Sequence, residues 1–216
     1  MRSLILVATV SAIALSASAQ AGDFYVGLSA GHDFGTVDGV ATNAAGLFPG
    51  AYDYDASGGS IGILAGFNIH HDNLVLGLEG DINWSDIDEQ ADFVNTLATD
   101  YTHETEVNWT AAIRARLGIT HGNNIVYVAA GYALADTDQN IRFTGAPAPF
   151  QSYSDTRSGW TLGAGVDHAF DETFSGRLEY RYTNYGDVSD DTGINSIDDN
   201  ELTTHALRAA LIMKLN

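Results

Sequence analysis

The feature that most constrains the fold is a two-residue alternation of polar and apolar side chains that recurs along the chain. In the stretch GRLEYRYTNYG at 176–186, charged residues occupy positions 177, 179 and 181, whereas leucine and tyrosines occupy positions 178, 180 and 182. Successive side chains of a β-strand point to opposite faces. The stretch is therefore predicted to be a strand with one charged face and one apolar, aromatic face.

Alternating segments of about ten residues, separated by turn-rich stretches, recur eight times. They lie near 23–33, 58–69, 74–84, 103–120, 125–135, 158–170, 173–185 and 202–215. Short connections at 70–73, 121–124 and 171–172 alternate with long ones at 34–57, 85–102, 136–157 and 186–201. In an up-and-down meander this places all short turns, and both termini, at one end. We predict an all-β fold, an eight-stranded antiparallel up-and-down β-barrel, because closure removes the strand edges.

Glycine and aromatic residues indicate which face of the predicted barrel is enclosed. A soluble lipocalin-like barrel would enclose its apolar face, whereas a transmembrane barrel turns that face to lipid. Here the charged residues share their face with many glycines. The interior of an eight-stranded barrel has room only for packed side chains, so long arginine and glutamate side chains need small neighbours there. Aromatic residues gather at strand ends, like the interfacial girdles of a membrane barrel. The predicted girdle residues are Phe24, Phe67, Trp84, Trp109, Trp160, Phe170, Phe174, Tyr180 and Tyr182. We therefore expect a transmembrane β-barrel. The segment 125–135 is apolar at both parities, so its sequence does not show which of its faces is enclosed.

The polar face supplies a nearly balanced set of charges for the interior. The expected acids are Glu79, Asp81, Glu106, Asp167 and Glu179, and the expected bases are Arg114, Arg116, Arg177, Arg181, Arg208 and Lys214. Burial demands such balance, because an unpaired buried charge is strongly destabilising. Arginine also suits fixed, bidentate pairing with carboxylates. We predict a network of ion pairs that fills the lumen, rather than an open pore.

The remaining charge is strongly acidic and unevenly distributed. The chain has 28 acids, 9 bases and a formal net charge of −19, which argues against a nucleic-acid partner. The long connections, taken as 33–57, 85–104, 136–157 and 186–201, hold 19 of the acids, with only Arg142 and Arg157 as bases. One end of the barrel is therefore expected to be anionic. The chain has no cysteine, so it has no disulfide, thiolate metal site or cysteine nucleophile.

The N-terminus carries the pattern of an export signal. A positive charge in Met1–Ser3 precedes an apolar run from Leu4 to Leu15, which is too short for the roughly 20 residues of a spanning helix. An A-x-A cleavage pattern follows at 19–21, with a second candidate at 17–19. We predict a signal peptide at 1–21 and a barrel domain at 22–216.

An ordered set of motifs resembles a known family. The stretches are GDFYVGLSAG (22–31), LVLGLEGDINW (74–84), NWTAAIRARLG (108–118), GWTLGAGVDHAF (159–170), LEYRYTNYG (178–186) and HALRAALIMKL (205–215). In this order they resemble the small outer-membrane β-barrel family of opacity-protein-like and OmpA-barrel-like proteins, often called the porin family of alphaproteobacteria. The resemblance covers almost all of the predicted strands.

The resemblance implies a bacterial outer-membrane barrel with short periplasmic turns and variable surface loops. It also implies contact with outer-membrane lipid and lipopolysaccharide, and recognition of the last strand by the barrel-assembly machinery. Two positions depart from the family pattern. The chain ends in Leu215-Asn216 where an aromatic residue is usual, and Asp167 stands where the family usually has glutamate.

The sequence gives little sign of catalysis, a metal site or a cofactor. His103, His168, His205 and Ser158 lie on or near strands, but no Gly-x-Ser-x-Gly elbow is present. The segment 53–58 begins like a calcium loop, yet its twelfth position is Leu64 rather than glutamate. The other candidates are His70-His71 and the acids Asp190, Asp191, Asp198, Asp199 and Glu201, for which solvated turns and loops are the simpler interpretation. We expect a protein that is not an enzyme and holds no cofactor.

Three roles fit these features. The first is a structural protein with an ion-paired lumen that stabilises the membrane and displays acidic loops. The second is a narrow porin that passes small solutes or cations. The third is a surface adhesin or antigen.

Overall fold

The computed structural model describes residues 22–43, 50–94, 100–143, 151–191 and 195–215, and side chains over 22–35, 57–85, 108–137, 156–186 and 202–215. Eight long strands account for nearly all of it. They are β1 (Gly22–Asn43), β2 (Gly50–His71), β3 (Leu74–Val94), β4 (Asp100–His121), β5 (Asn124–Phe143), β6 (Gln151–Ala169), β7 (Phe174–Asp191) and β8 (Asn195–Leu215). The predicted signal peptide at 1–21 lies outside the described residues and stays a prediction.

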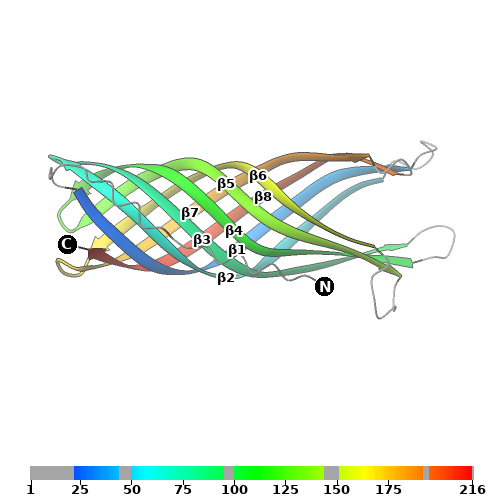
Figure 1. Cartoon of the computed structure of the whole chain (residues 1–216), viewed down its shortest axis with the longest axis horizontal. Coiled ribbons are helices and arrows are strands. Elements are labelled where there is room, and N and C mark those ends of the chain that lie inside the picture. The colour runs from blue at the N-terminus through cyan, green and yellow to red at the C-terminus, as the bar shows by residue number, and fades with distance from the viewer. Residues whose placement is uncertain (1–21, 44–49, 95–99, 144–150, 192–194, 216) are drawn as a thin grey trace.

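The strands form one closed antiparallel barrel. Each strand pairs with its neighbours in sequence, and β1 closes the ring by pairing with β8 from Phe24–Leu215 to Asn43–Asn195. Figure 1 shows the strands tilted around a long, narrow tube, with the C-terminus at one end. The predicted eight-stranded up-and-down fold is confirmed.

Short turns lie at the end of the barrel that carries the C-terminus. Asp72 has a positive φ of 53° in the β2–β3 turn, and Gly122 has a φ of 59° in the β4–β5 turn. Aspartate and glycine are among the few residues that adopt this left-handed conformation readily. The β6–β7 turn is held by Asp171, whose Oδ1 accepts hydrogen bonds from the backbone N–H groups of Thr173 and Phe174. The three predicted short turns are confirmed.

At the opposite end, the predicted long loops are wrong over most of their length. The strands continue through most of 34–57, 85–102, 136–157 and 186–201, and the connections that remain, at 44–49, 95–99, 144–150 and 192–194, lie outside the described residues. Sequence alternation marks a strand only where one face is apolar. Residues 36–43, TVDGVATN, lack strict alternation, so their strand rests on backbone pairing that the pattern does not reveal.

The two faces of the barrel differ sharply in chemistry. Large apolar side chains cover the outside over about ten residues of each strand, from Phe24 to Phe34 on β1 and from Leu74 to Trp84 on β3. We call this band the apolar belt, and its height matches that of membrane barrels. On β5, whose faces the sequence left open, Tyr127, Ala129 and Ala133 point inward. Across the described residues there is no helix long and apolar enough to span a membrane.

Candidate functional site: the charged barrel interior

The interior at the level of the apolar belt is occupied by charged side chains. Glu79 and Arg114 are at most 1 % exposed. The predicted interior residues that the structure brings together are Glu79, Asp81, Arg114, Arg116, Asp167, Arg177, Glu179, Arg181 and Arg208, all of them buried. Strand alternation explains the grouping, since each of these residues has inward parity on its strand. We call this set, with Asp33, Tyr25 and Tyr127, the interior network.

Toward the short turns, Asp167 of β6 forms ion pairs with two arginines. Arg177 donates from Nε to Oδ1 of Asp167 at 2.7 Å, and Arg116 donates from Nη2 to Oδ2 at 2.8 Å. Arg116 also donates from Nη1 to the hydroxyl of Tyr25 at 2.8 Å. Its guanidinium carbon lies 3.9 Å from the ring centre of Tyr127, within cation–π range. Arg116 and Arg177 thus share Oδ2 of Asp167, and the rings of both tyrosines lie within cation–π range of the two guanidinium groups.

At the centre, Arg114 of β4 links two glutamates. Its Nη2 donates to Oε1 of Glu79 at 2.6 Å, and its Nη1 donates to Oε1 of Glu179 at 2.8 Å. The hydroxyls of Tyr25 and Tyr127 donate to the second oxygens of Glu79 and Glu179, at 2.8 and 2.6 Å. Both glutamates therefore have both oxygens bonded, which offsets the cost of removing them from water.

Toward the opposite end, Asp81 of β3 forms a bidentate ion pair with Arg181 of β7. The two Nη atoms of Arg181 donate to the two Asp81 oxygens at 2.8 and 3.2 Å, and its Nε donates to Glu179 at 3.0 Å. Arg208 of β8 donates from Nη2 to Oδ1 of Asp33 at 2.9 Å, and its Nη1 lies 3.7 Å from Asp81. The bidentate geometry fixes Arg181 in place.

Several of these pairs cross the lumen rather than join neighbouring strands. In the closed strand order, β3 and β7 are four strands apart in either direction, so they form opposite walls. Arg177 of β7 donates to Glu79 of β3 at 2.5 Å, and Arg181 donates to Asp81 on the same two strands. The interior network therefore bridges the full width of the barrel at two levels.

Two predicted interior positions, Lys214 and Glu106, need separate comment. Lys214 lies at the short-turn rim, where its Nζ is 3.6 Å from Asp23 and a third of its side chain is exposed, so it is not part of the network. Glu106 belongs to β4 by its backbone pairing with Asp88 and Asp138, but its side chain lies outside the described residues.

Sequence reasoning missed several buried interior residues, among them Asp33, Tyr25, Tyr127 and Arg157. Asp33 was placed at the boundary between a predicted strand and a long connection, and Arg157 was placed in a long connection, although both are buried on their strands. Tyr25 shares parity with Gly27, and this signal could have placed it beside the glycines of the charged face.

The predicted girdle aromatics lie on the outer face. Trp84, Trp160 and Tyr180 are about half exposed. The rings of Phe24 and Phe67 are 4.7 Å apart near the short-turn end, and those of Trp160 and Tyr182 are 5.3 Å apart near the other end. The rest are Phe170 and Phe174, exposed beside the β6–β7 turn, and Trp109, which pairs in register with Trp84.

Within the part of the chain whose side chains are described, no group of three or more histidine and acidic side chains is placed to hold a metal ion. The acids Asp190, Asp191, Asp198, Asp199 and Glu201, and the start of the calcium-like segment, have side chains outside this part. His70 instead lies 3.3 Å from Asp23 at the rim.

Comparisons with known proteins agree with this architecture. The chain matches the sequence model of the outer membrane protein beta-barrel domain over residues 3–211. It is 30 % identical over 200 residues to the 31 kDa outer-membrane immunogenic protein of Brucella melitensis, an alignment that covers 88 % of this chain and 82 % of that relative.

Solved structures show the same fold. OprG of Pseudomonas aeruginosa superposes with a TM-score of 0.51 at 13 % identity, covering 91 % of this chain and 97 % of that one. Neisserial surface protein A gives a TM-score of 0.50 at 16 % identity, covering 91 % and 100 %. A closed eight-stranded barrel with an apolar belt, matched over nearly its whole length by this family, places the chain in the bacterial outer membrane, and the chain belongs to the outer membrane protein beta-barrel domain family.

Proposed function

We propose that this outer-membrane barrel is a closed, structural protein that anchors a surface-exposed sheet, and that it neither conducts solutes nor catalyses a reaction. The observation that carries the proposal is the pairing of β7 with β3 across the lumen, by Arg177–Glu79 and Arg181–Asp81. An eight-stranded barrel leaves room only for packed side chains. Ion pairs that span this space leave no continuous water path at their level.

A second feature supports display at the cell surface. β1 extends to Asn43 and β3 to Val94, well beyond the last belt residues Phe34 and Trp84. At the end opposite the short turns, the strands extend beyond the apolar belt. The connections between them would therefore lie outside the membrane. The Brucella relative is named for being immunogenic, which is in keeping with this role.

Conductance of the purified protein in planar bilayers tests closure. We expect few or no stable conductance steps from the wild-type barrel, because the network must part before ions pass. Arg114→Ala removes the link between Glu79 and Glu179 and should raise the frequency of steps. Lys214→Ala, at the rim, should behave as the wild type. Frequent stable steps from the wild-type barrel would instead favour the narrow porin.

Epitope tags on intact cells test display. A tag inserted within 144–150, between β5 and β6, should react with antibody without permeabilisation. A matched tag at 122–123, in the β4–β5 turn, should react only after permeabilisation. The reverse pattern would overturn the proposed orientation. Attachment of tagged or loop-deleted cells to surfaces would show whether an adhesive role exists as well.

A further inference from the structure

Beyond the apolar belt, the barrel divides into two sheets. Pairing between β2 and β3 ends at Ser60–Ser85, and pairing between β6 and β7 ends at Trp160–Asn184. The other pairings continue almost to the strand ends. Among the described residues, one sheet therefore consists of β7, β8, β1 and β2, and the other of β3, β4, β5 and β6. Figure 1 shows the strand ends in these two groups at the end opposite the C-terminus.

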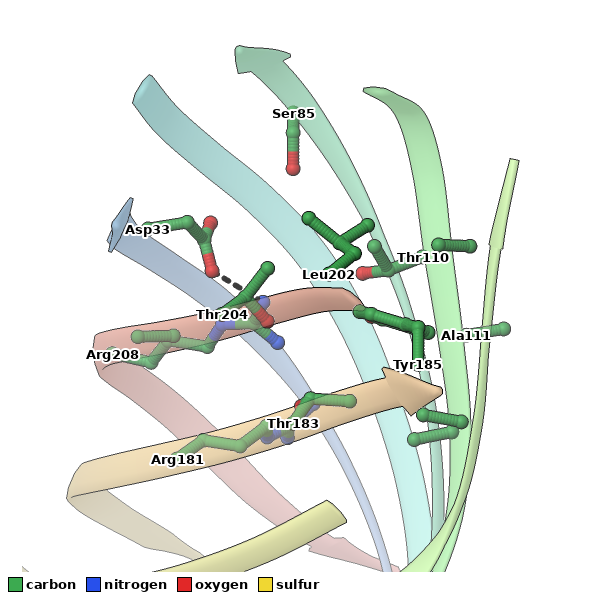
Figure 2. A pocket seen from close by; sticks show the side chains of 14 residues that line it. Asp33, Ser85, Thr110, Ala111, Arg181, Thr183, Tyr185, Leu202, Thr204 and Arg208 are labelled. Atoms are coloured by element: carbon green, nitrogen blue, oxygen red, sulfur yellow. Dashed lines mark hydrogen bonds and ion pairs between the residues drawn. The ribbon is translucent and has the colours of Figure 1, made fainter. Parts of the chain in front are cut away.

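The interior below this division has no room for a partner. The cavity there has a volume of about 30 Å³, which holds one or two water molecules. Figure 2 shows Ser85, from the last β2–β3 pair, above Arg208 and Arg181 in its wall. Arg208 has two nitrogens without a hydrogen-bond partner, Nε and Nη1, and water satisfies donors of this kind. A partner of this end of the molecule must therefore bind to its strands.

The division leaves strand edges that have no neighbour within the described ranges: β2 at 50–59, β3 at 86–94, β6 at 151–159 and β7 at 185–191. An unpaired edge is a template for another strand unless it is blunted. Bulges blunt β3 and β7 where they leave their neighbours, as register shifts show between Trp84 and Ile87 and between Asn184 and Asp187. The edges of β2 and β6 have no bulge, since β2 pairs regularly with β1, and β6 with β5, throughout.

The free edge of β2 presents a regular row of main-chain donors and acceptors. On β3, Asn73 accepts from the N–H of Thr120 on β4, so the next residue, Leu74, faces β2 and its partner His71. Main-chain groups alternate in direction along a strand, so odd-numbered residues of β2 point their N–H and C=O groups toward β3. Even-numbered residues are hydrogen-bonded to β1. Past the division, the odd-numbered residues without a partner strand are Ala51, Asp53, Asp55, Ser57 and Gly59.

Charge determines which kind of strand suits this edge. The sequences of the β2 and β3 edges contain no base and six acids, which are Asp53, Asp55, Asp86, Asp88, Glu89 and Asp92. The β6 edge contains one acid and one base, Asp155 and Arg157. A second copy of the β2 edge would bring like charges together, which is destabilising between paired strands. A basic strand gains the opposite interaction, so charge favours a basic partner at β2 over a second copy of this chain.

We propose that the free edge of β2 binds an extended, basic segment of another polypeptide, which adds as a strand alongside residues 51–59. Main-chain hydrogen bonds supply the affinity of such an added strand, and its side chains supply the selectivity. The last large apolar residue of β2 in the belt is Ile61, so the edge lies beyond the membrane. Access of a partner outside the cell rests on the proposed surface display of this end, whereas binding itself does not.

Binding to the purified barrel in non-ionic detergent micelles tests the proposal. The probe is a blocked peptide of about ten residues that alternates lysine with threonine, a residue that favours strands. Replacement of every lysine by glutamate should weaken binding at least tenfold. N-methylation of every backbone nitrogen keeps the charge but removes the donors, and it should also weaken binding at least tenfold. Added salt should weaken binding of the lysine peptide, because it screens exposed charges.

Amide hydrogen exchange, followed by NMR, locates the bound peptide. Exchange should slow at the odd-numbered residues of 51–59, because their N–H groups gain an acceptor. It should change little at the even-numbered residues, which are already hydrogen-bonded to β1. Attraction between charges alone would leave this alternation absent, and that result would overturn the added strand.

Variants separate the β2 edge from the rest of the molecule. Ser57→Pro removes one N–H of the free edge and should weaken binding of the lysine peptide at least tenfold, since proline is tolerated at an edge but blocks pairing there. Ser154→Pro is the matched control on β6. There Ala169 donates to Asn123 beside β5, so even-numbered N–H groups face the free edge. This control should bind the peptide like the wild type. Folding of each variant is checked by its heat-dependent gel mobility.

The remaining outcomes decide between partners. Equal binding of the glutamate peptide would refute a basic partner, and absence of binding by the lysine peptide would refute the site. Equal losses in Ser57→Pro and Ser154→Pro would refute its location at β2. Dimers of the barrel that Ser57→Pro abolishes would assign the edge to a second copy instead. Because these assays use the purified protein, their failure is distinguishable from a reversed epitope-tag pattern on cells, which would contradict surface display.

Discussion

At the scale of the residue, Glu79 shows why the interior holds as a unit. It is fully buried and accepts hydrogen bonds from Arg114, Arg177 and Tyr25, with Arg116 3.6 Å away. Removing this carboxylate from water carries a large desolvation cost, which its basic and hydroxyl partners offset. The sequence identified Glu79 as inward by parity, but not which of the arginines would reach it.

Glu79→Ala should lower the free energy of unfolding by about 3–5 kcal/mol, because it leaves the arginines around it as uncompensated buried charges. Urea titration of the barrel in phospholipid vesicles, read by tryptophan fluorescence, measures this change.

Asp23→Ala is the matched control for that substitution. Asp23 also contacts basic side chains, His70 and Lys214, but it is a third exposed at the rim. Its loss should cost less than about 1 kcal/mol, since water screens exposed pairs. Equal losses from the two variants would mean that burial does not set the strength of these pairs.

At the scale of the element, close strand contact depends on glycines of the inward face. An added Cβ at Gly131 of β5 would lie 2.7 Å from the Cα of Arg114 on β4, closer than packed atoms allow. Backbone cannot move aside as a flexible side chain can. The parity of glycine and charge in the sequence indicated an enclosed face, and the register of β4 with β5 places Gly131 directly opposite Arg114.

Gly131→Ala should destabilise the barrel by about 1–3 kcal/mol, the range typical of overpacking. Gly59→Ala on β2 is the matched control, because an added Cβ there meets nothing within 4 Å. Its effect should stay within about 0.5 kcal/mol. Urea midpoints measured in the same vesicles compare the two, and an unchanged midpoint in Gly131→Ala would show that the strands can separate at this point.

At the scale of the whole molecule, the apolar belt fixes the position of the barrel in the membrane. Leu211 lies in the middle of the belt on β8, and Leu207 lies near its edge at the end away from the short turns. Both are about half exposed in the absence of lipid. Depth in the bilayer is therefore the main difference between them.

Leu211→Arg should cost about 2–4 kcal/mol in a bilayer, and Leu207→Arg about 0–1 kcal/mol, because the cost of a charge falls toward the interface. Vesicle unfolding measures both changes. In detergent micelles, which have no fixed thickness, the difference should shrink. A larger cost at Leu207 would mean that the belt is displaced from the position assigned here.

The sequence by itself determined the strand number, the antiparallel order, the short turns and the faces of most strands, because alternation and turn residues are local signals. It also identified nine of the buried charges, since parity alone decides which side chains point inward. Only the tertiary structure decided which charges meet, because partners such as Arg177 and Glu79 lie on opposite walls and closure sets their distance. It likewise decided how far the strands extend toward the anionic end, because pairing there no longer requires an apolar face. The unused donors of Arg208 emerge only from that assembled interior, since the position of every neighbouring strand determines which nitrogens remain free.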